Sequence, residues 1–313
     1  MSNKYTIGIV GVGNVGSTLA FSLASSNLCN KILLKDIRED FIKAMALDIS
    51  QAILSLDLNC KIIPTNSTNR FKDCDIVVIT AGVARKPNMS REDLLITNSN
   101  IMKSILDEVF QENKNAIYII VSNPLDALVY FTLKYTNLPR NRVLGMAGTL
   151  DSARFKYYIS QKLNFEYKKI DAIVIGSHSS FMLPLINHAK VDDKKIIDIL
   201  SKEDIKDILE NTKNGGAKIV DLIGTSAYFA PAQSIFNMCK AILNDNKEEF
   251  CASVMLLNEF GYNDTALGVP IILGKNGVEQ IKKLELSYVE KQDLYKSSLV
   301  VQESINILKK ETI

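Results

Sequence analysis

The stretch that decides the fold reads Tyr5-Thr-Ile-Gly-Ile-Val-Gly-Val-Gly-Asn-Val-Gly16. Residues 5–10 form a short apolar run rich in β-branched side chains, which predicts a buried strand. Glycines follow at positions 11, 13 and 16, and a helical pattern covers residues 15–26. A GxGxxG spacing alone is a weak signal, because short glycine motifs recur by chance. Between a strand and a helix, however, it predicts a phosphate-binding turn.

Each glycine of this turn has a separate expected task. Gly11 permits the tight turn, Gly13 lets the backbone approach a pyrophosphate, and Gly16 allows the helix to pack closely on the strand. The first turn of the helix presents free N–H groups and the positive end of its dipole to phosphates. The predicted phosphate-binding residues are Gly11, Val12, Gly13, Asn14, Val15 and Gly16.

An acid completes this motif. Asp36 follows the next predicted strand and lies twenty residues beyond Gly16. A carboxylate there accepts hydrogen bonds from the ribose hydroxyls and repels a 2′-phosphate, so we expect the cofactor to be NAD rather than NADP. Arg38 weakens this expectation slightly, since a guanidinium tolerates the phosphate. The alternative is that the glycines form an ordinary turn and that Asp36 is a solvated strand end.

Strands and helices alternate along the first half of the chain. Further apolar runs at residues 32–34, 75–80 and 116–121 predict strands, and a helical pattern covers residues 41–54. Ser90 is a candidate N-cap for a second long helix. This alternation predicts an α/β fold with a doubly wound (Rossmann) parallel sheet.

The pattern changes after about Gly145. Longer helices are predicted at residues 150–163, 192–210 and 217–243, and strands become sparse. The final helix is expected to open with a capping box and to turn three apolar residues inward; the box is Ser287 and Glu290, and the inward residues are Leu294, Leu299 and Ile305. We therefore expect an NAD-binding Rossmann domain at residues 1–145 and an α+β substrate and catalytic domain at residues 146–313.

Composition excludes several classes of protein. The 313 residues are 47% hydrophobic and 23% charged, with a net charge of only +2. No basic stripe indicates nucleic-acid binding, and no apolar stretch reaches the roughly 20 residues that span a membrane. The N-terminus lacks a signal-peptide pattern. The five cysteines include no CxxC pair, so reduced, mostly buried thiols and a cytoplasmic location are expected.

Polar residues near the ends of predicted strands are candidates for a catalytic site. His178 follows the β-rich run 171–176, whereas His188 lies in an apparently helical stretch, residues 184–190, and is expected to be a surface or packing residue. Asp151 and Arg154 are three residues apart and share a helix face, where they could equally form a simple ion pair. Asn123 comes directly after a strand, at the sheet edge where open α/β sheets bind ligands.

Taken together, five segments resemble the lactate/malate dehydrogenase family. They are GVGNVG (11–16), TAGVARKPNMSREDLL (80–95), VSNPLDA (121–127), GMAGTLDSARF (145–155) and TSAYFAPA (225–232). The segments occur in the order of the family, and the resemblance extends over nearly the whole chain. Several motifs in register are far more specific than any one of them.

The resemblance implies a role for each candidate residue. His178 would take up and return the substrate proton, and Asp151 would hold the imidazole tautomer. Arg154 would bind the C1 carboxylate in a bidentate pair. Arg91 would polarise the C2 carbonyl, and Asn123 would bind substrate and the nicotinamide end of NAD. The remaining residues implied at that end are Asn98, Val121 and Ser122. No metal is implied, and the expected assembly is a homo-dimer or homo-tetramer.

Arg85 is expected to select the substrate. It lies in a segment, residues 84–92, that would close over the site and exclude water. Lactate-specific members of the family carry Gln at the matching place, and malate-specific members carry Arg. A second substrate carboxylate needs a cation in a closed pocket, and without one Arg85 would be enclosed unpaired. Malate and oxaloacetate are therefore the expected substrate pair, with lactate and pyruvate as the alternative.

One segment departs from the family pattern. In the family, Gly, Asp and a small residue usually follow the catalytic His, but here the run is His178-Ser179-Ser180-Phe181. We expect an altered loop around the imidazole, which leaves a catalytically impaired NAD-binding protein as another alternative. An NAD-dependent glycosidase is a third, but such chains are typically longer and use a Cys/His metal site, and no Cys lies close in sequence to either histidine here.

Overall fold

One twisted sheet forms the centre of the molecule. The computed structural model describes residues 5–84, 89–165 and 169–311. The first six strands are β1 (Thr6–Val10), β2 (Lys31–Lys35), β3 (Lys61–Pro64), β4 (Ile76–Ile79), β5 (Ile117–Ile120) and β6 (Val143–Gly145). They pair in parallel in the order β3-β2-β1-β4-β5-β6. The predicted doubly wound sheet is confirmed, although β3 was not predicted.

The second half of the chain extends this sheet. Its long strands are β12 (Glu248–Leu257), β13 (Asn263–Gly274) and β14 (Gly277–Ile281). They form antiparallel pairs, and β12 pairs with β6 at Ser253 and Gly145, so nine strands make one sheet. A side chain at Gly145 would collide with Leu125, since its Cβ would lie 2.3 Å from a Leu125 methyl carbon. This glycine therefore allows a helix to pack directly on the junction.

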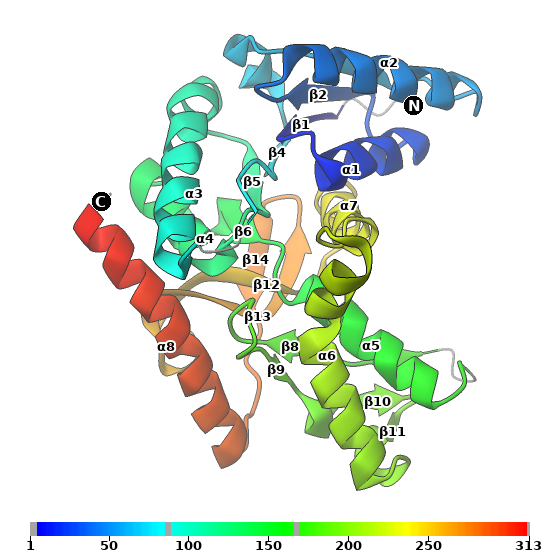
Figure 1. Cartoon of the computed structure of the whole chain (residues 1–313), viewed down its shortest axis with the longest axis vertical. Helices are drawn as coiled ribbons and strands as arrows, with labels where there is room; N and C mark the ends of the chain where they lie inside the picture. Colours follow the sequence, from blue (N-terminus) through cyan, green and yellow to red (C-terminus); the bar gives the residue numbers. More distant parts are fainter. Residues whose placement is uncertain (1–4, 85–88, 166–168, 312–313) are drawn as a thin grey trace.

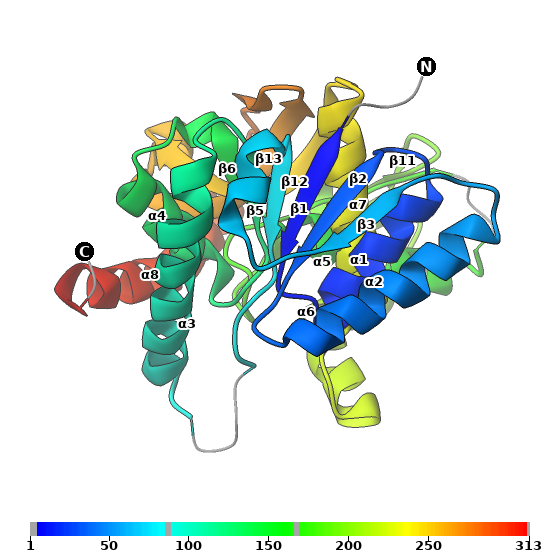
Figure 2. The same ribbon diagram turned by 90° about the horizontal axis from the view of Figure 1, so that it is seen from above.

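Helices cover both faces of the sheet (Figures 1 and 2). On one face lie α1 (Asn14–Ser25), α2 (Glu39–Leu54) and α7 (Phe229–Leu243), with α1 packed against both of the others. On the other face lie α3 (Arg91–Ile105), α4 (Leu125–Thr136) and α8 (Tyr288–Glu311), which contact one another. Because both faces are covered, β1, β4 and β5 are buried throughout.

A smaller lobe lies below the sheet in Figure 1. It contains α5 (Thr149–Lys162), α6 (Lys202–Ile223) and the short strands β7 (Ile170–Asp171), β8 (Val174–Ile175), β9 (Leu183–Pro184), β10 (Lys190–Val191) and β11 (Lys194–Lys195). A separate apolar core around Phe155, Ile159 and Val174 holds it together. An isolated bridge between Gly176 and Gly268 joins the end of β8 to β13, which brings the His178 loop up to the large sheet.

Four expectations for the second half are wrong. The helix predicted at residues 192–210 begins only at Lys202, because residues 194–198 form β11 and a 3₁₀ turn. The helix predicted at 217–243 is two helices, since Gly224 adopts a left-handed conformation (φ 71°) that ends α6. Leu299 is 48% exposed instead of inward. The stretch around His188 is a single 3₁₀ turn, Ile186–His188.

Other local predictions are confirmed. Ser90 caps α3 by accepting a hydrogen bond from the Asp93 backbone N–H (2.9 Å). Ser287 and Glu290 form the expected capping box at the start of α8. The cysteines Cys29, Cys60, Cys74, Cys239 and Cys251 are all free and buried. Among the described helices, none is both long and apolar enough to cross a bilayer.

Candidate active site

The glycine turn joins β1 to α1 and is built from backbone contacts. Gly11 has φ +93°, and an added Cβ would lie 2.4 Å from the Ala81 backbone nitrogen. A Cβ at Gly16 would lie 2.1 Å from the Gly11 carbonyl oxygen. Thr80 donates its hydroxyl to that same carbonyl (2.6 Å). Close packing here therefore requires glycine at both positions.

Gly13 is different, because a Cβ there would meet no atom within 4 Å. It is the N-cap of α1 and has no side-chain cap, so the first N–H groups of the helix stay available. Asn14 is exposed and Val15 is half-buried beside it. The open surface at Gly13 and the uncapped helix end fit a pyrophosphate. Val12 has another partner, since its N–H donates to Asp36 Oδ2 (2.8 Å).

Asp36 directly follows β2, and its carboxylate accepts several hydrogen bonds. Besides the Val12 N–H, the Arg38 guanidinium donates to both carboxylate oxygens, at 2.9 and 3.0 Å. Burial alone would raise the pKa of Asp36, but the hydrogen bonds from Arg38 and Val12 lower it to about 2. The carboxylate is therefore ionised at neutral pH. Arg38 is engaged with Asp36 rather than free to receive a 2′-phosphate.

These residues line a cavity of about 660 Å³. Its walls include Gly11, Gly13, Asp36, Ile37, Arg38, Thr80, Ala81, Gly82, Val83, Ile101, Ile105 and Glu108. The cavity is of the size that cofactor sites occupy, and the apolar side chains provide flat surfaces for a purine ring. The uncapped helix end, the open Gly13 and the ionised Asp36 fit a dinucleotide such as NAD.

The strand ends next to the turn carry the other predicted cofactor residues. Asn98 is 2% exposed, and its side-chain amide forms two hydrogen bonds with the Val83 backbone. Its Oδ1 accepts from the Val83 N–H at 2.8 Å, and its Nδ2 donates to the Val83 carbonyl at 3.1 Å. It also donates to the Asn123 carbonyl (2.6 Å). Ser122 is buried and donates to the Ala81 carbonyl (2.5 Å). Asn98 and Ser122 thus hold backbone in place, while the Asn123 residue is exposed and Val121 is half-buried.

His178 and Asp151 meet as the sequence predicts. Asp151 lies on the first turn of α5, His178 follows β8, and the His178 Nδ1 and Asp151 Oδ2 atoms are 2.7 Å apart. The Asp151 side chain is 1% exposed and that of His178 is 16% exposed. With Nδ1 bound to the carboxylate, Nε2 of the ring is left to exchange a proton with a bound molecule.

Burial and charge act in opposite directions on this pair. Burial disfavours the charged imidazole, but the charge and hydrogen bond of Asp151 outweigh it and raise the pKa of His178. Burial likewise opposes ionisation of Asp151, yet His178 and Arg154 lower the pKa of its carboxyl. Both shifts favour an imidazolium beside a carboxylate, and an imidazolium can donate a proton to a bound molecule.

Arg154 lies one turn further along α5. Its Nη1 donates to Asp151 Oδ1 at 3.2 Å, and its side chain is largely buried. Gly216 of α6 faces the guanidinium, and an added Cβ there would lie 3.4 Å from Nη2. The glycine thus leaves room for the Arg154 guanidinium, which lies in the same side-chain cluster as His178 and can receive a carboxylate.

Arg85 and Arg91 both belong to the segment 84–92 that is predicted to close over the site. Arg91 is exposed at the start of α3, directly after the Ser90 cap. Arg85 lies outside the described residues, as do residues 86–88 of the segment 84–92 that is predicted to close over the site. The structure therefore places His178, Asp151 and Arg154 together but leaves Arg85 unplaced.

Sequence reasoning missed Asp126 and Ser297. Asp126 of α4 is buried, and its Oδ2 accepts a hydrogen bond from the His178 backbone N–H (2.8 Å). Ser297 of α8 is fully buried, and its Oγ accepts from the Ser177 N–H (2.7 Å). Asp126 lies within the VSNPLDA segment, which was a usable signal; Ser297 had none.

The unusual loop after His178 keeps the pair intact. Ser179 Oγ lies 2.7 Å from Ser177 Oγ and accepts a hydrogen bond from the Phe181 N–H (3.1 Å). Phe181 itself is 46% exposed. The departure from the family pattern is therefore compatible with the 2.7 Å contact between His178 and Asp151.

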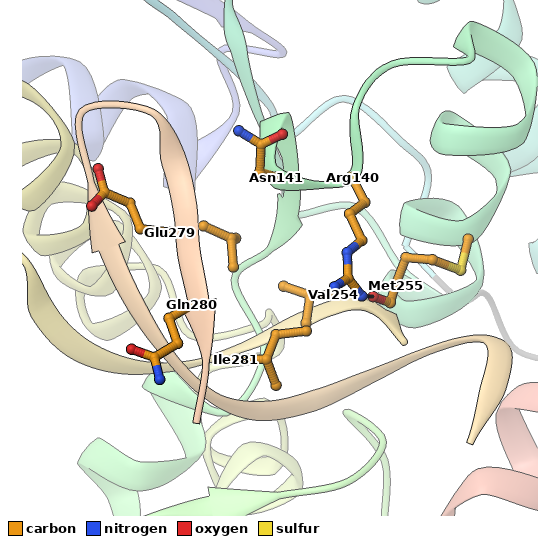
Figure 3. A pocket seen from close by; sticks show the side chains of 8 residues that line it. Arg140, Asn141, Val254, Met255, Glu279, Gln280 and Ile281 are labelled. Carbon is orange, nitrogen blue, oxygen red and sulfur yellow. Dashed lines mark hydrogen bonds between the residues drawn. The ribbon is translucent and has the colours of Figure 1, made fainter. Parts of the chain in front are cut away.

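Another cavity is far too small for a dinucleotide. It measures about 60 Å³ and lies between β14 and the Arg140 turn (Figure 3). Its arginine already donates to Glu259 (2.8 Å) and to the Met255 carbonyl (3.3 Å). No three His, Cys, Asp or Glu side chains within residues 5–84, 89–165 and 169–311 lie close enough to hold a metal ion.

Comparison with known proteins identifies the family. The profile of the lactate/malate dehydrogenase NAD binding domain matches residues 5–145, and that of the family's alpha/beta C-terminal domain matches residues 148–312. This chain belongs to the lactate/malate dehydrogenase family. The predicted resemblance is confirmed, and the match favours a dehydrogenase over the glycosidase alternative. The N-terminal match also bears out the expected NAD cofactor.

Relatives within the lactate/malate dehydrogenase family agree over the full chain. Malate dehydrogenase from Aliarcobacter butzleri is 56% identical over 309 residues, which is 98% of both chains. Among solved structures, malate dehydrogenase from Cryptosporidium parvum aligns with a TM-score of 0.93 at 35% identity, over 98% of this chain and 99% of that one. Lactate dehydrogenase from the same organism, with lactic acid and NAD, aligns with a TM-score of 0.94 at 33% identity, over 99% of both chains.

Proposed function

We propose that the protein interconverts (S)-malate and oxaloacetate with NAD(H). The observation that carries this proposal is the 56% identity, over 98% of both chains, to a protein named malate dehydrogenase. The His178–Asp151 pair at 2.7 Å supports it. Bound NAD(H) supplies hydride transfer. We propose residues 1–145 as the part that binds it and residues 146–313 as the substrate and catalytic domain.

The side chains have the following proposed roles. His178 Nε2 takes the hydroxyl proton of malate and returns it to the oxaloacetate carbonyl oxygen. Asp151 holds the ring through Nδ1 and stabilises the imidazolium, as its short contact and burial allow. Arg154 binds the C1 carboxylate, since its guanidinium lies in the same cluster as His178. Arg91 polarises the carbonyl as negative charge develops on oxygen.

Substrate choice is assigned to Arg85. A four-carbon diacid brings a second carboxylate, and a buried carboxylate needs a cation. Arg85 is the proposed partner, as the family resemblance implies. Asn123, Val121 and Asn98 are proposed for the nicotinamide end; the two asparagines are joined by the 2.6 Å hydrogen bond between them.

A lactate dehydrogenase is the second candidate, because a lactate dehydrogenase with lactic acid aligns over 99% of the chain. A steady-state assay with NADH, oxaloacetate and pyruvate separates the candidates. We expect kcat/KM for oxaloacetate to exceed that for pyruvate by at least about 100-fold. The reverse preference would establish a lactate dehydrogenase. Tight NADH binding without turnover of any 2-oxo acid would instead indicate an impaired relative.

We also propose that the protein forms a homo-dimer or homo-tetramer in the cytoplasm. Large apolar side chains are exposed on α1 and α2, among them Phe21, Leu47 and Leu54. Such side chains commonly mark interfaces between copies of a chain. The free, buried thiols fit a reducing compartment. Sedimentation equilibrium at several concentrations tests the assembly, and a monomer at all of them would contradict it.

A further inference from the structure

The backbone at His178 is held at three consecutive N–H groups. The Gly176 N–H donates to the Gly268 carbonyl of β13 at 2.8 Å. The Ser177 N–H donates to Ser297 Oγ of α8 at 2.7 Å, and the His178 N–H donates to Asp126 Oδ2 of α4 at 2.8 Å. A loop bound by three separate elements in this way has little freedom to move.

We infer that Asp126 and Ser297 are positioning residues that set the place of the His178 imidazole through its backbone. This inference rests on the proposed role of His178. In the described structure, the imidazole forms its side-chain hydrogen bond with Asp151 and not with either of these residues. Both are buried, and both accept a hydrogen bond from an N–H that would otherwise be left unpaired. An error of about 1 Å in the position of a catalytic group costs roughly 100-fold in rate.

A glycine in the His178 loop allows α8 to approach closely. Gly176 has φ +88°, and an added Cβ would lie 2.5 Å from Ser297 Oγ. Only glycine allows both that backbone conformation and that distance. Ser297 Oγ also lies 3.0 Å from Ser177 Oγ, which in turn lies 2.7 Å from Ser179 Oγ. Three serine hydroxyls thus connect α8 to the part of the loop that departs from the family pattern.

Asp126 adds an electrostatic effect to its hydrogen bond. Its Oδ1 has no hydrogen-bond partner in the described part of the chain, and neither has the neighbouring Ser253 hydroxyl. Burial raises the pKa of Asp126, while the neighbouring Ser253 hydroxyl, the His178 N–H and the imidazole act to lower it. The groups that act on the imidazole are Asp151 and Arg154 from α5 and Asp126 from α4. In its ionised form Asp126 favours the imidazolium and so acts to raise the pKa of His178.

Matched variants test the role of Ser297. Ser298 is the next residue of α8, is also buried, and donates its hydroxyl to the Tyr295 carbonyl of its own helix (2.8 Å). We expect Ser297→Ala to lower kcat for oxaloacetate by about 10- to 100-fold, with an unchanged Kd for NADH. Ser298→Ala should leave kcat within about twofold, as a substitution away from the site. Equal kcat values for the two variants would overturn the inference.

Two substitutions at Asp126 separate its hydrogen bond from its charge. Asp126→Ala removes both and should lower kcat by about 100-fold. Asp126→Asn keeps an acceptor oxygen, so it should restore kcat at least about tenfold over Asp126→Ala. Removing the charge should lower the pKa of His178 by about one pH unit. Thr132→Ala is the control, because Thr132 is buried on α4 and bonds only within that helix in the described structure (2.7 Å to the Leu128 carbonyl).

The pKa is measured by NMR titration of the imidazole signals, with NADH bound. The chain has two histidines, and His188→Gln assigns the signals. This measurement needs no turnover. A protein that reduces no 2-oxo acid would therefore contradict the proposed function, while the NMR comparison would still decide this inference. A His178 pKa that is the same in wild type and Asp126→Asn would overturn the electrostatic effect of Asp126, and equal kcat values for Asp126→Ala and wild type would overturn its positioning role.

Discussion

The dinucleotide site and the His178 site are built in opposite ways. The glycine turn is a continuous stretch of chain whose backbone makes the contacts, and its key distances lie between residues 11, 16 and 81. The His178 site is assembled from side chains on α4, α5 and α8, and the Ser177–Ser297 hydrogen bond joins residues 120 positions apart. The first can be read from a local motif. The second exists only after the whole chain has folded.

The largest expected effect comes from removing the imidazole alone. His178→Asn should lower kcat by at least about 1000-fold, because proton transfer to and from the substrate loses its carrier. The NADH site should be intact, since the hydrogen bonds described for the glycine turn are made with Asp36 and Thr80. Stopped-flow turnover and NADH fluorescence titration measure the two quantities. Near-normal kcat would remove His178 from the mechanism.

A change at Arg85 should alter selectivity while leaving both sites in place. In Arg85→Gln, oxaloacetate loses the partner of its second carboxylate, so the kcat/KM ratio of oxaloacetate to pyruvate should fall by at least about 100-fold. Competition assays with both substrates measure the ratio. If selectivity stayed as in wild type, the assignment of Arg85 would be wrong.

Two alanine substitutions in the glycine turn separate its contribution to stability from its contribution to NADH binding. Gly16→Ala should lower the free energy of unfolding by about 1–3 kcal/mol, because the new Cβ would meet the Gly11 carbonyl oxygen at 2.1 Å. Gly13→Ala should leave stability unchanged, since its Cβ meets nothing and its φ is −71°. It should nevertheless weaken NADH binding about tenfold by obstructing the pyrophosphate. Thermal melts and NADH titration with both variants test this; equal melting temperatures for the two would contradict it.

The smallest expected effect is the dependence of rate on pH. Because Asp151 raises the pKa of His178, the imidazolium needed to reduce oxaloacetate persists above the ordinary histidine pKa of 6.5. The kcat/KM for reduction should therefore be flat at pH 6.5 and fall only above the raised pKa, by about tenfold per pH unit. Malate oxidation needs neutral imidazole and should rise with pH over the same range. A reduction rate already falling below pH 6.5 would contradict the electrostatic account.

The same contrast explains what could be predicted from sequence. Buried parallel strands are apolar runs, so β1, β4 and β5 could be predicted from the sequence. The start of α3 could also be predicted, because Ser90 is a local capping residue. Leu299 was misplaced because five residues along a helix rotate a side chain by roughly 140°, away from the buried face of Leu294. The break at Gly224 had a local signal, a glycine able to end a helix. The contacts of Asp126 and Ser297 had none, since they join distant segments.

The position of Ser297 on α8 has a consequence for biosynthesis. Domains generally fold as units while the chain emerges from the ribosome, N-terminal part first. β1 to β6 and their glycine turn are complete before residue 146 is added, whereas α8 follows every other helix and strand in chain order. The contacts of the glycine turn thus join residues already present at that point, whereas the Ser177–Ser297 hydrogen bond can form only after α8 has been synthesised.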